Sequence, residues 1–355
     1  MRLSRIRGAG RVLAVTAAAA LLASCGRVPP KGHPEQERIV WPPPPDPPRI
    51  EYVRSVRSPA DLGIRKNWLT RTVGYVLHGR QSLGMARPYA VAVTDRGAIA
   101  VADADGGCVH VYDVPAGKYR RLVEAEHAAL VSPVGIAVDP EGRLYVADST
   151  RAAVFRFGAS GAWIDTIGGG GELERPTGLA FDPGRSRLYV VDTVADSIAA
   201  YDVAGHRVAR FGHRGAGPGE FNRPVAVAVD RAGRIYVTDS LNFRVQVFEP
   251  DGTFVRAFGE QGLGPGGFDK AKGIALDADG HVYVVEGLHD VVNVFDAQGR
   301  LLTVVGATGN GPGEFGLPAG IHVDGEGRIF VADSANRRIE VFRYLGEPEQ
   351  RGSGL

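Results

Sequence analysis

The sequence is poor in cysteine and has no long apolar run. Cys25 and Cys108 are the two cysteines among 355 residues, so at most one disulfide could form within the chain. The apolar stretch at residues 12–23 is too short to span a bilayer as a helix. The net charge of +1 gives no general reason to expect a nucleic acid or an anionic membrane as the partner.

Short motifs that carry catalytic chemistry are also missing. The sequence contains no GxSxG, HExxH, CxxC or CxxCH motif, and no glycine loop of the phosphate-binding type that leads into a helix. We therefore predict no catalytic residue and favour a binding protein over an enzyme. The 49 glycines are typical of a chain with many turns between short apolar strands.

The N-terminus resembles the export signal of a bacterial lipoprotein. Cationic residues precede the apolar stretch, which ends in Leu22-Ala23-Ser24-Cys25, a tetrapeptide that resembles the lipobox. The resemblance implies removal of residues 1–24 and lipid attachment to Cys25, which would leave Cys108 without a disulfide partner. It also implies a place in the bacterial cell envelope, periplasmic or surface-exposed, and at the outer membrane if the cell has one, because Gly26 follows the cysteine. An ordinary secretory signal is the alternative.

Three further segments flank or interrupt the body of the chain. Residues 25–49 are rich in proline, cannot pack a core and are predicted to form an extended stalk. Plain disorder, which would serve as a tether equally well, is the alternative. Residues 57–84 are predicted to be a helical insertion, with Ser58 as cap and an amphipathic helix over residues 59–77. Residues 346–355 are a polar tail.

A repeat accounts for the remaining residues, 50–345. Six apolar segments begin at spacings of 43–48 residues, and most follow a proline directly, as Val225-Ala-Val-Ala-Val229 follows Pro224. A second apolar strand that ends in Asp or Glu follows each segment, as in Arg234-Ile-Tyr-Val-Thr-Asp239. This period is typical of a four-stranded propeller blade. We predict an all-β, six-bladed β-propeller with four-stranded antiparallel blades.

The repeat resembles the NHL family of propellers. The motifs that carry the resemblance are the Gly-Pro-Gly loops of residues 212–224, 259–271 and 306–318 and the turns at Asp239-Ser-Leu-Asn242 and Asp333-Ser-Ala-Asn336. The resemblance implies a lipid-anchored NHL-repeat protein, and NHL-like propellers commonly bind partners on their top face. The first three blades depart from these loop motifs.

The last repeat lacks a fourth strand. Residues 51–56 match the fourth-strand pattern, so we expect them to close the ring as the outer strand of blade six. The helical insertion would then lie on the top face, which we define as the face formed by the fourth-to-first and second-to-third strand connections.

Cations precede the first strand in four of the six blades. We predict a top-face binding site for an anionic ligand or an acidic partner, because loops on a rigid scaffold are where binding residues gather. Solvated surface charge is the alternative. The candidates are Arg87, Arg175, Arg223, Lys270, Lys272, Asn242, His289 and Asn336.

Carboxylates and histidines could instead point to a metal. The acid that ends each second strand recurs in every blade, so we expect it to cap a turn through backbone N–H groups. Phe221, Phe268 and Phe315 are expected to be plugs between blades. His322 replaces a small residue in blade six and is a weak candidate metal ligand. No cofactor is predicted, while calcium or zinc is not excluded.

Two classes of function remain. The first is a tethered scaffold that binds an envelope protein, a peptide or a glycan, and no nucleic acid. The alternative is a metal-dependent enzyme of the lactonase or lyase class with its site in the central channel, which requires several ligand groups to converge there.

Overall fold

A computed structural model describes residues 38–64 and 84–346 of the chain. The predicted signal, Cys25, most of the stalk, residues 65–83 of the helical insertion and residues 347–355 of the tail lie outside this range. None of the described helices is both long and apolar enough to cross a membrane.

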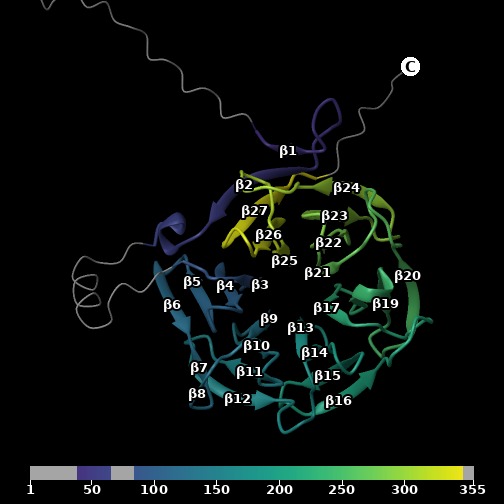
Figure 1. Ribbon diagram of the computed structural model, residues 1–355. Helices are drawn as coiled ribbons and strands as arrows, with labels where there is room; N and C mark the ends of the chain where they lie inside the picture. The colour runs from purple at the N-terminus through teal and green to yellow at the C-terminus, as the bar shows by residue number, and fades with distance from the viewer. Residues whose placement is uncertain (1–37, 65–83, 347–355) are drawn as a thin grey trace, which may run out of the picture. The chain divides into compact units, whose positions relative to one another are not determined.

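The described residues form a six-bladed β-propeller, as predicted. Six antiparallel sheets surround a central axis (Figure 1). Blades one to three contain β3–β6, β9–β12 and β13–β16, and blades four and five contain β17–β20 and β21–β24. Blade six contains β25–β27 together with β2.

The strands are short and evenly spaced along the chain. In blades one to three they are β3 (Pro88–Val93), β4 (Ala98–Asp103), β5 (Cys108–Asp113), β6 (Lys118–Leu122), β9 (Pro133–Val138), β10 (Leu144–Asp148), β11 (Ala153–Phe157), β12 (Trp163–Ile167), β13 (Pro176–Asp182), β14 (Arg187–Asp192), β15 (Ser197–Asp202) and β16 (Arg207–Phe211). A small hairpin of β7 (Glu124–Ala125) and β8 (Ala128–Ala129) joins the first two blades.

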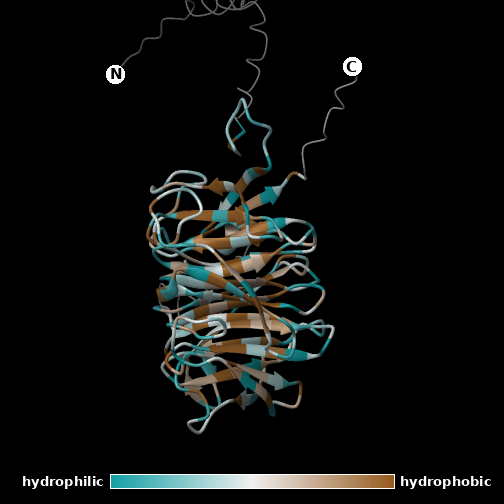
Figure 2. Ribbon diagram, turned by 90° about the vertical axis from the view of Figure 1, so that its right-hand side faces the viewer, coloured by the Kyte–Doolittle hydropathy of each residue, from teal (hydrophilic) through white to brown (hydrophobic). Residues whose placement is uncertain are grey.

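Blades four to six repeat the same order. Their strands are β17 (Pro224–Val229), β18 (Ile235–Asp239), β19 (Arg244–Phe248), β20 (Phe254–Phe258), β21 (Ala271–Leu276), β22 (Val282–Glu286), β23 (Val291–Phe295), β24 (Leu301–Val305), β25 (Pro318–Val323), β26 (Arg328–Asp333) and β27 (Arg338–Tyr344). Hydrophobic residues are concentrated in the strands (Figure 2). They pack blade against blade in successive clusters.

The first strands form a closed inner ring. Each contacts the first strands of both neighbouring blades, and β25 contacts β3. Small residues permit this approach: a Cβ added to Gly135 would lie 1.8 Å from the carbonyl oxygen of Thr177, and one added to Gly320 would lie 2.5 Å from that of Tyr89. The split between small and β-branched residues in each first strand therefore follows from crowding at the axis.

The N-terminal strand β2 (Ile50–Val56) closes the ring, as predicted. It pairs antiparallel with β27, with Ile50 opposite Tyr344 and Val56 opposite Ile339. The Ser55 hydroxyl donates a hydrogen bond of 2.7 Å to the Glu340 carboxylate of β27. Residues from the two ends of the described chain thus share one sheet (Figure 1).

The prediction of an unpacked stalk is wrong for its last residues. Strand β1 (Val40–Trp41) pairs with β2 as a fifth strand of blade six. The Trp41 ring packs edge-on against Phe342 with 5.5 Å between ring centroids. Burial of this aromatic surface favours the contact. The neighbouring prolines are compatible with it because β1 is an edge strand.

The helical insertion begins differently from the prediction. Pro59–Leu62 form a 3-10 helix, η1, rather than the start of an α-helix, and Gly63 ends it with a left-handed φ of 73°. Ser58 is the N-cap residue, as predicted, and both its backbone N–H and its hydroxyl donate to Asp61, at 2.8 and 3.1 Å. A left-handed glycine is a common helix terminator. Residues 65–83 of the predicted helix lie outside the described range.

Phenylalanine plugs lie in the loops that precede blades four, five and six, as predicted. Phe221, Phe268 and Phe315 are fully buried. Each ring lies over a glycine with positive φ, and a Cβ added to Gly212, Gly259 or Gly306 would come within 2.4 Å of the ring. Glycine is therefore required at these positions both for its backbone angle and for space.

Candidate functional site

The acid at the end of each second strand caps the loop that enters its own blade. Asp103 accepts the N–H groups of Ala86 and Arg87, both at 2.7 Å. Equivalent bonds reach Asp148, Asp192, Asp239, Glu286 and Asp333. The turn-capping prediction is confirmed, and these carboxylates serve to fix the top-face loops.

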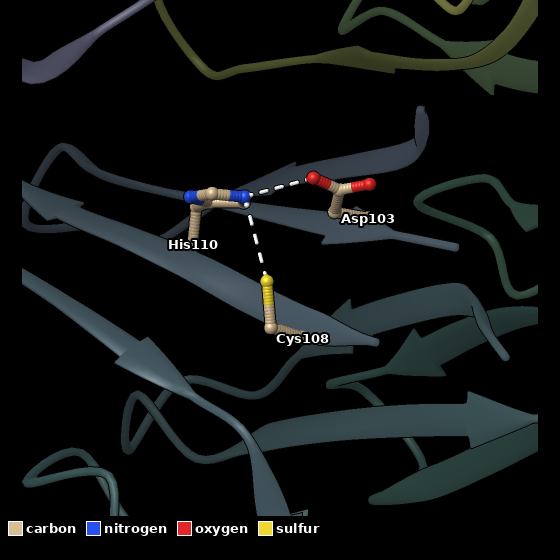
Figure 3. Close-up of side chains that lie close together, drawn as sticks. All are labelled: Asp103, Cys108 and His110. Carbon is tan, nitrogen blue, oxygen red and sulfur yellow. Dashed lines mark hydrogen bonds and ion pairs between the residues drawn. The ribbon is translucent and has the colours of Figure 1, made fainter. Parts of the chain in front are cut away.

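Blade one adds a cysteine and a histidine to this acid (Figure 3). His110 Nε2 lies 3.0 Å from Asp103 Oδ2 and 3.5 Å from Cys108 Sγ, and all three side chains are buried. His110 Nδ1 lies 2.8 Å from the Tyr119 hydroxyl. These residue types can hold a metal ion.

The same contacts recur where no such set exists. In blade four, Gln246 Nε2 donates to Asp239 Oδ2 at 3.0 Å, from the strand position that His110 occupies in blade one. His110 therefore repeats the structural role of Gln246. The arrangement stabilises the blade without requiring an ion.

A second group of possible ligands lies at the turn between β21 and β22. His281 Nδ1 is 2.7 Å from Asp277 Oδ2, and Asp279 lies beside them. In blade four, Arg234 Nε donates to Asp230 Oδ2 at 2.8 Å from the same turn positions. His281 thus takes the place of the arginine that closes this turn elsewhere.

The central channel is narrow in its upper half. A space of about 70 Å³ lies there between the first strands. The second residue of five of these strands and the third residue of β13 line it: Tyr89, Val134, Val225, Lys272, Ala319 and Gly178. This set contains no carboxylate or imidazole and includes a cation, so these residues do not fit a metal ion.

A pocket of about 330 Å³ opens on the top face beside this channel. It lies between blades five, six and one, and four cations line it together with Asp105. Arg87 and Asp105 form an exposed ion pair of 3.5 Å, which contributes little to stability. We call this pocket the cationic pocket; its cations are Arg87, Lys270, Lys272 and Arg337.

The surroundings of Lys272 in the cationic pocket shift its pKa strongly. Its ammonium group donates a hydrogen bond of 3.0 Å to the carbonyl oxygen of Pro318. Burial, and then the positive charges of Lys270 and Arg87, lower the pKa of Lys272 to about 8. The folded protein thus holds like charges close together at this point.

The predicted cationic residues separate into two groups. Arg87, Lys270 and Lys272 come together in the cationic pocket. Arg175 lies close enough to Tyr89 to oppose the rise in its pKa that burial causes. Arg223 does not line the cationic pocket, and its backbone N–H donates to Asp196 at 2.7 Å.

The other predicted binding residues are held by neighbouring loops. Asn242 donates to Asp239 and to the carbonyl oxygen of Gly215, and Asn336 makes the matching bonds to Asp333 and Gly309, all at 2.8 Å. His289 Nε2 lies 3.1 Å from Asp269. We therefore leave these three side chains out of the candidate site.

Arg337 was missed because the prediction considered only cations that directly precede a first strand. Blade six carries Leu317 there, whereas Arg337 reaches the same face from the second-to-third strand turn. Its position follows that of Asn336 in the repeat, so comparison of these turns across the blades could have indicated it.

Comparisons with known proteins agree with the fold. A family model described as the SMP-30/gluconolactonase/LRE-like region matches residues 90–261, and a model described as a 6-bladed beta-propeller matches residues 276–348. A search of curated proteins finds no match.

Solved structures of low sequence identity share the propeller. A protein of unknown function from Bacteroides thetaiotaomicron is 18% identical with a TM-score of 0.58, over 74% of this chain and 70% of its own. A streptogramin B lyase is 11% identical with a TM-score of 0.57, over 74% and 95%. The virginiamycin B lyase of Staphylococcus aureus is 14% identical with a TM-score of 0.55, over 73% and 96%. At these identities the likeness concerns the fold.

Proposed function

We propose that this protein is a binding scaffold whose cationic pocket takes a carboxylate-bearing segment of a partner, such as an acidic peptide or glycan. The observation that carries the proposal is the half-buried Lys272, whose charge is disfavoured by burial and by Lys270 and Arg87. An anion bound in the cationic pocket would relieve this repulsion, which supplies a driving force for binding.

The scaffold holds these cations in place before a ligand arrives. Asp103 fixes the backbone at Arg87, and Glu286 fixes the backbone at Lys270 through a bond of 2.9 Å. Lys272 lies on the inner strand β21. Positions fixed in this way reduce the ordering cost of binding. Four cations oppose one carboxylate, Asp105, in the lining of the cationic pocket.

The setting of the scaffold is part of the proposal. A lipidated Cys25 and a proline-rich tether would display an NHL-type propeller at the cell envelope, where an envelope protein, peptide or glycan is the partner and no nucleic acid is expected. The lipobox resemblance supports this placement. Metabolic labelling with a fatty acid, which should be lost on Cys25→Ser, tests it.

Binding can be measured with the full chain in neutral phosphatidylcholine nanodiscs. The probes are fluorescent hexaglutamate and hexaglutamine, followed by anisotropy. We expect hexaglutamate alone to bind, with an affinity that falls as salt increases. Lys272→Met should weaken binding about 10-fold or more. Binding should also weaken as the pH rises through about 8, because Lys272 then loses its charge.

Arg223→Gln is the matched control, since it removes a top-face cation outside the cationic pocket and should leave binding unchanged. Equal losses for Lys272→Met and Arg223→Gln would reduce the effect to general surface charge. Equal affinity for the two peptides would overturn the proposal.

A second candidate function is a lactonase- or lyase-like activity. It is favoured by the match of residues 90–261 to the SMP-30/gluconolactonase/LRE-like region and by Lys272, whose pKa of about 8 suits a general base. The lyases among the similar structures support only the fold. Turnover of simple lactones that Lys272→Met abolishes would support this candidate, whereas lack of turnover with added calcium, magnesium or zinc would argue against it.

A further inference from the structure

The channel widens toward the bottom face, at the opposite end from the cationic pocket. A cavity of about 790 Å³ lies there, within the range of small-molecule sites in proteins. The first-to-second strand turns of blades one, two and six, at residues 94–97, 139–140 and 324–326, line its mouth. We call this space the lower cavity.

Two stacked rings of apolar side chains line the lower cavity, together with a comparable surface of polar groups. Each blade contributes one residue to each ring, and the two residues lie two positions apart on its first strand. The deeper ring contains Val91, Ile136, Leu179, Val227, Ile274 and Ile321. The ring nearer the turns contains Val93, Val138, Phe181, Val229, Leu276 and Val323.

The position between the rings carries alanine in five blades and histidine in the sixth. Ala92, Ala137, Ala180, Ala228 and Ala275 all line the lower cavity, and His322 lies at the matching position. Within the described residues the imidazole makes no hydrogen bond or ion pair. Burial lowers its pKa to about 4, although Asp324 acts in the opposite direction. His322 is therefore neutral at pH 7 and offers one donor and one acceptor to a ligand.

The charges at the mouth are largely neutralised by one another. Asp139 pairs with Arg143 at 2.5 Å, and Asp324 pairs with Arg328 at 2.7 Å. Glu326 also contacts Arg328, at 3.4 Å. Asp95 and Arg96 add one charge of each sign to the lining. The mouth therefore selects neither an anion nor a cation strongly.

We propose that the lower cavity binds a neutral lipophilic small molecule with one hydroxyl or carbonyl group, which hydrogen-bonds to His322. Burial of the ligand's hydrocarbon surface against the apolar rings favours binding. The imidazole would also form a hydrogen bond that it lacks within the described residues. This site is independent of the cationic pocket, because the narrow upper channel separates the two.

The test uses radiolabelled 1-naphthol and naphthalene, which differ by one hydroxyl group, in equilibrium dialysis against the full chain in nanodiscs. Empty nanodiscs provide the partition background. We expect both compounds to bind, with 1-naphthol favoured by on the order of 10-fold through its hydrogen bond. In His322→Ala, the residue of the other five blades, the preference should fall to about one while naphthalene still binds.

Two further variants distinguish binding in the lower cavity from non-specific adsorption to the protein surface. Val229→Trp places a bulky ring in the outer apolar ring and should abolish binding of both compounds. Val255→Trp alters an exposed residue of the outer strand β20 and should change nothing. Circular dichroism and thermal unfolding establish that each variant is folded.

Three results would overturn the proposal. The first is a naphthol preference that survives in His322→Ala, and the second is retention of binding in Val229→Trp. The third is a dimer in light scattering that Val229→Trp dissociates, which would assign the mouth of the lower cavity to a second copy of the chain.

Discussion

Blades four and one place the same acid under the top-face loops but surround it with different side chains. In blade four, Asp239 Oδ2 accepts bonds from Asn242, Arg244 and Gln246. In blade one, Asp103 Oδ2 lies within hydrogen-bond distance of His110 Nε2, and Cys108 occupies the position of Arg244. The acid is therefore a constant structural feature of the two blades, whereas the side chains that bond to it differ with the loop that precedes each blade.

In blades four and six this variation goes with the Gly-Pro-Gly loop that precedes the blade, whereas blade five follows such a loop and carries Val291 at the arginine position. The Arg244 guanidinium also donates to the carbonyl oxygens of Gly217 and Glu220, and Arg338 of blade six makes the matching bonds to Gly311 and Glu314. Both arginines thus tie a Gly-Pro-Gly loop to the blade. Blade one does not follow such a loop and carries no arginine at this position.

Removal of the arginine from blade six should give the largest effect. Arg338, Asp333 and Glu340 are almost fully buried, so Arg338→Met leaves two buried carboxylates without their cation. We expect a loss of about 3–5 kcal/mol in the free energy of unfolding, measured with urea. Arg244→Met should cost less, because the Arg244 side chain is 17% exposed. Equal losses would show that burial does not set the difference between these blades.

Glu340 occupies the position that Gln246 has in blade four. Glu340→Gln should change the free energy of unfolding by an intermediate amount that depends on pH. Burial raises the pKa of Glu340 to about 7, from 4.5 for a free carboxyl group. The folded state therefore binds the proton more tightly. The resulting stability is fully present below pH 4.5 and is lost as the pH rises through about 7.

Glu340→Gln should accordingly raise the unfolding free energy by about 1–3 kcal/mol at pH 8. At pH 4 the variant and the parent should differ little. Urea unfolding at the two pH values checks this expectation. A gain of the same size at both pH values would trace the effect to packing rather than to the proton.

Exchange of His110 for glutamine should give the smallest effect. The Gln amide can donate to Asp103 as Gln246 donates to Asp239, so we expect a change below about 1.5 kcal/mol. His110→Leu removes the donor and should cost about 1–3 kcal/mol. If both variants lose the same stability in urea, the histidine has a role that glutamine does not share, such as ligation of a metal with Cys108.

The sequence predicted the architecture well because each blade repeats its own local signals. The apolar first strand, the acid that ends the second strand and the closing strand near residues 51–56 all follow from pattern and period. The packing of Trp41 on Phe342 could not be predicted in this way, because it joins distant parts of the chain and the local prolines favour an extended stalk.

The candidate site was predicted only in part. Arg87, Lys270 and Lys272 were identified from their place at the start of a first strand, and the structure brings them together. The same rule also selected Arg223, which lies outside the cationic pocket, because equivalent positions on a ring can be far apart. The sequence alone shows that His322 departs from the repeat. The size and apolar lining of the lower cavity could not be predicted, because they depend on how all six blades pack around the channel.

The pairing of β2 with β27 also determines when the ring can close during synthesis of the chain. The ribosome completes residues 50–56 long before residues 338–344, so the strand that is synthesised first among the blades is among the last to find its partner. Until then it exposes an unpaired edge, which other chains can capture. An interruption of synthesis before residue 338 would therefore leave that strand without its place in the ring.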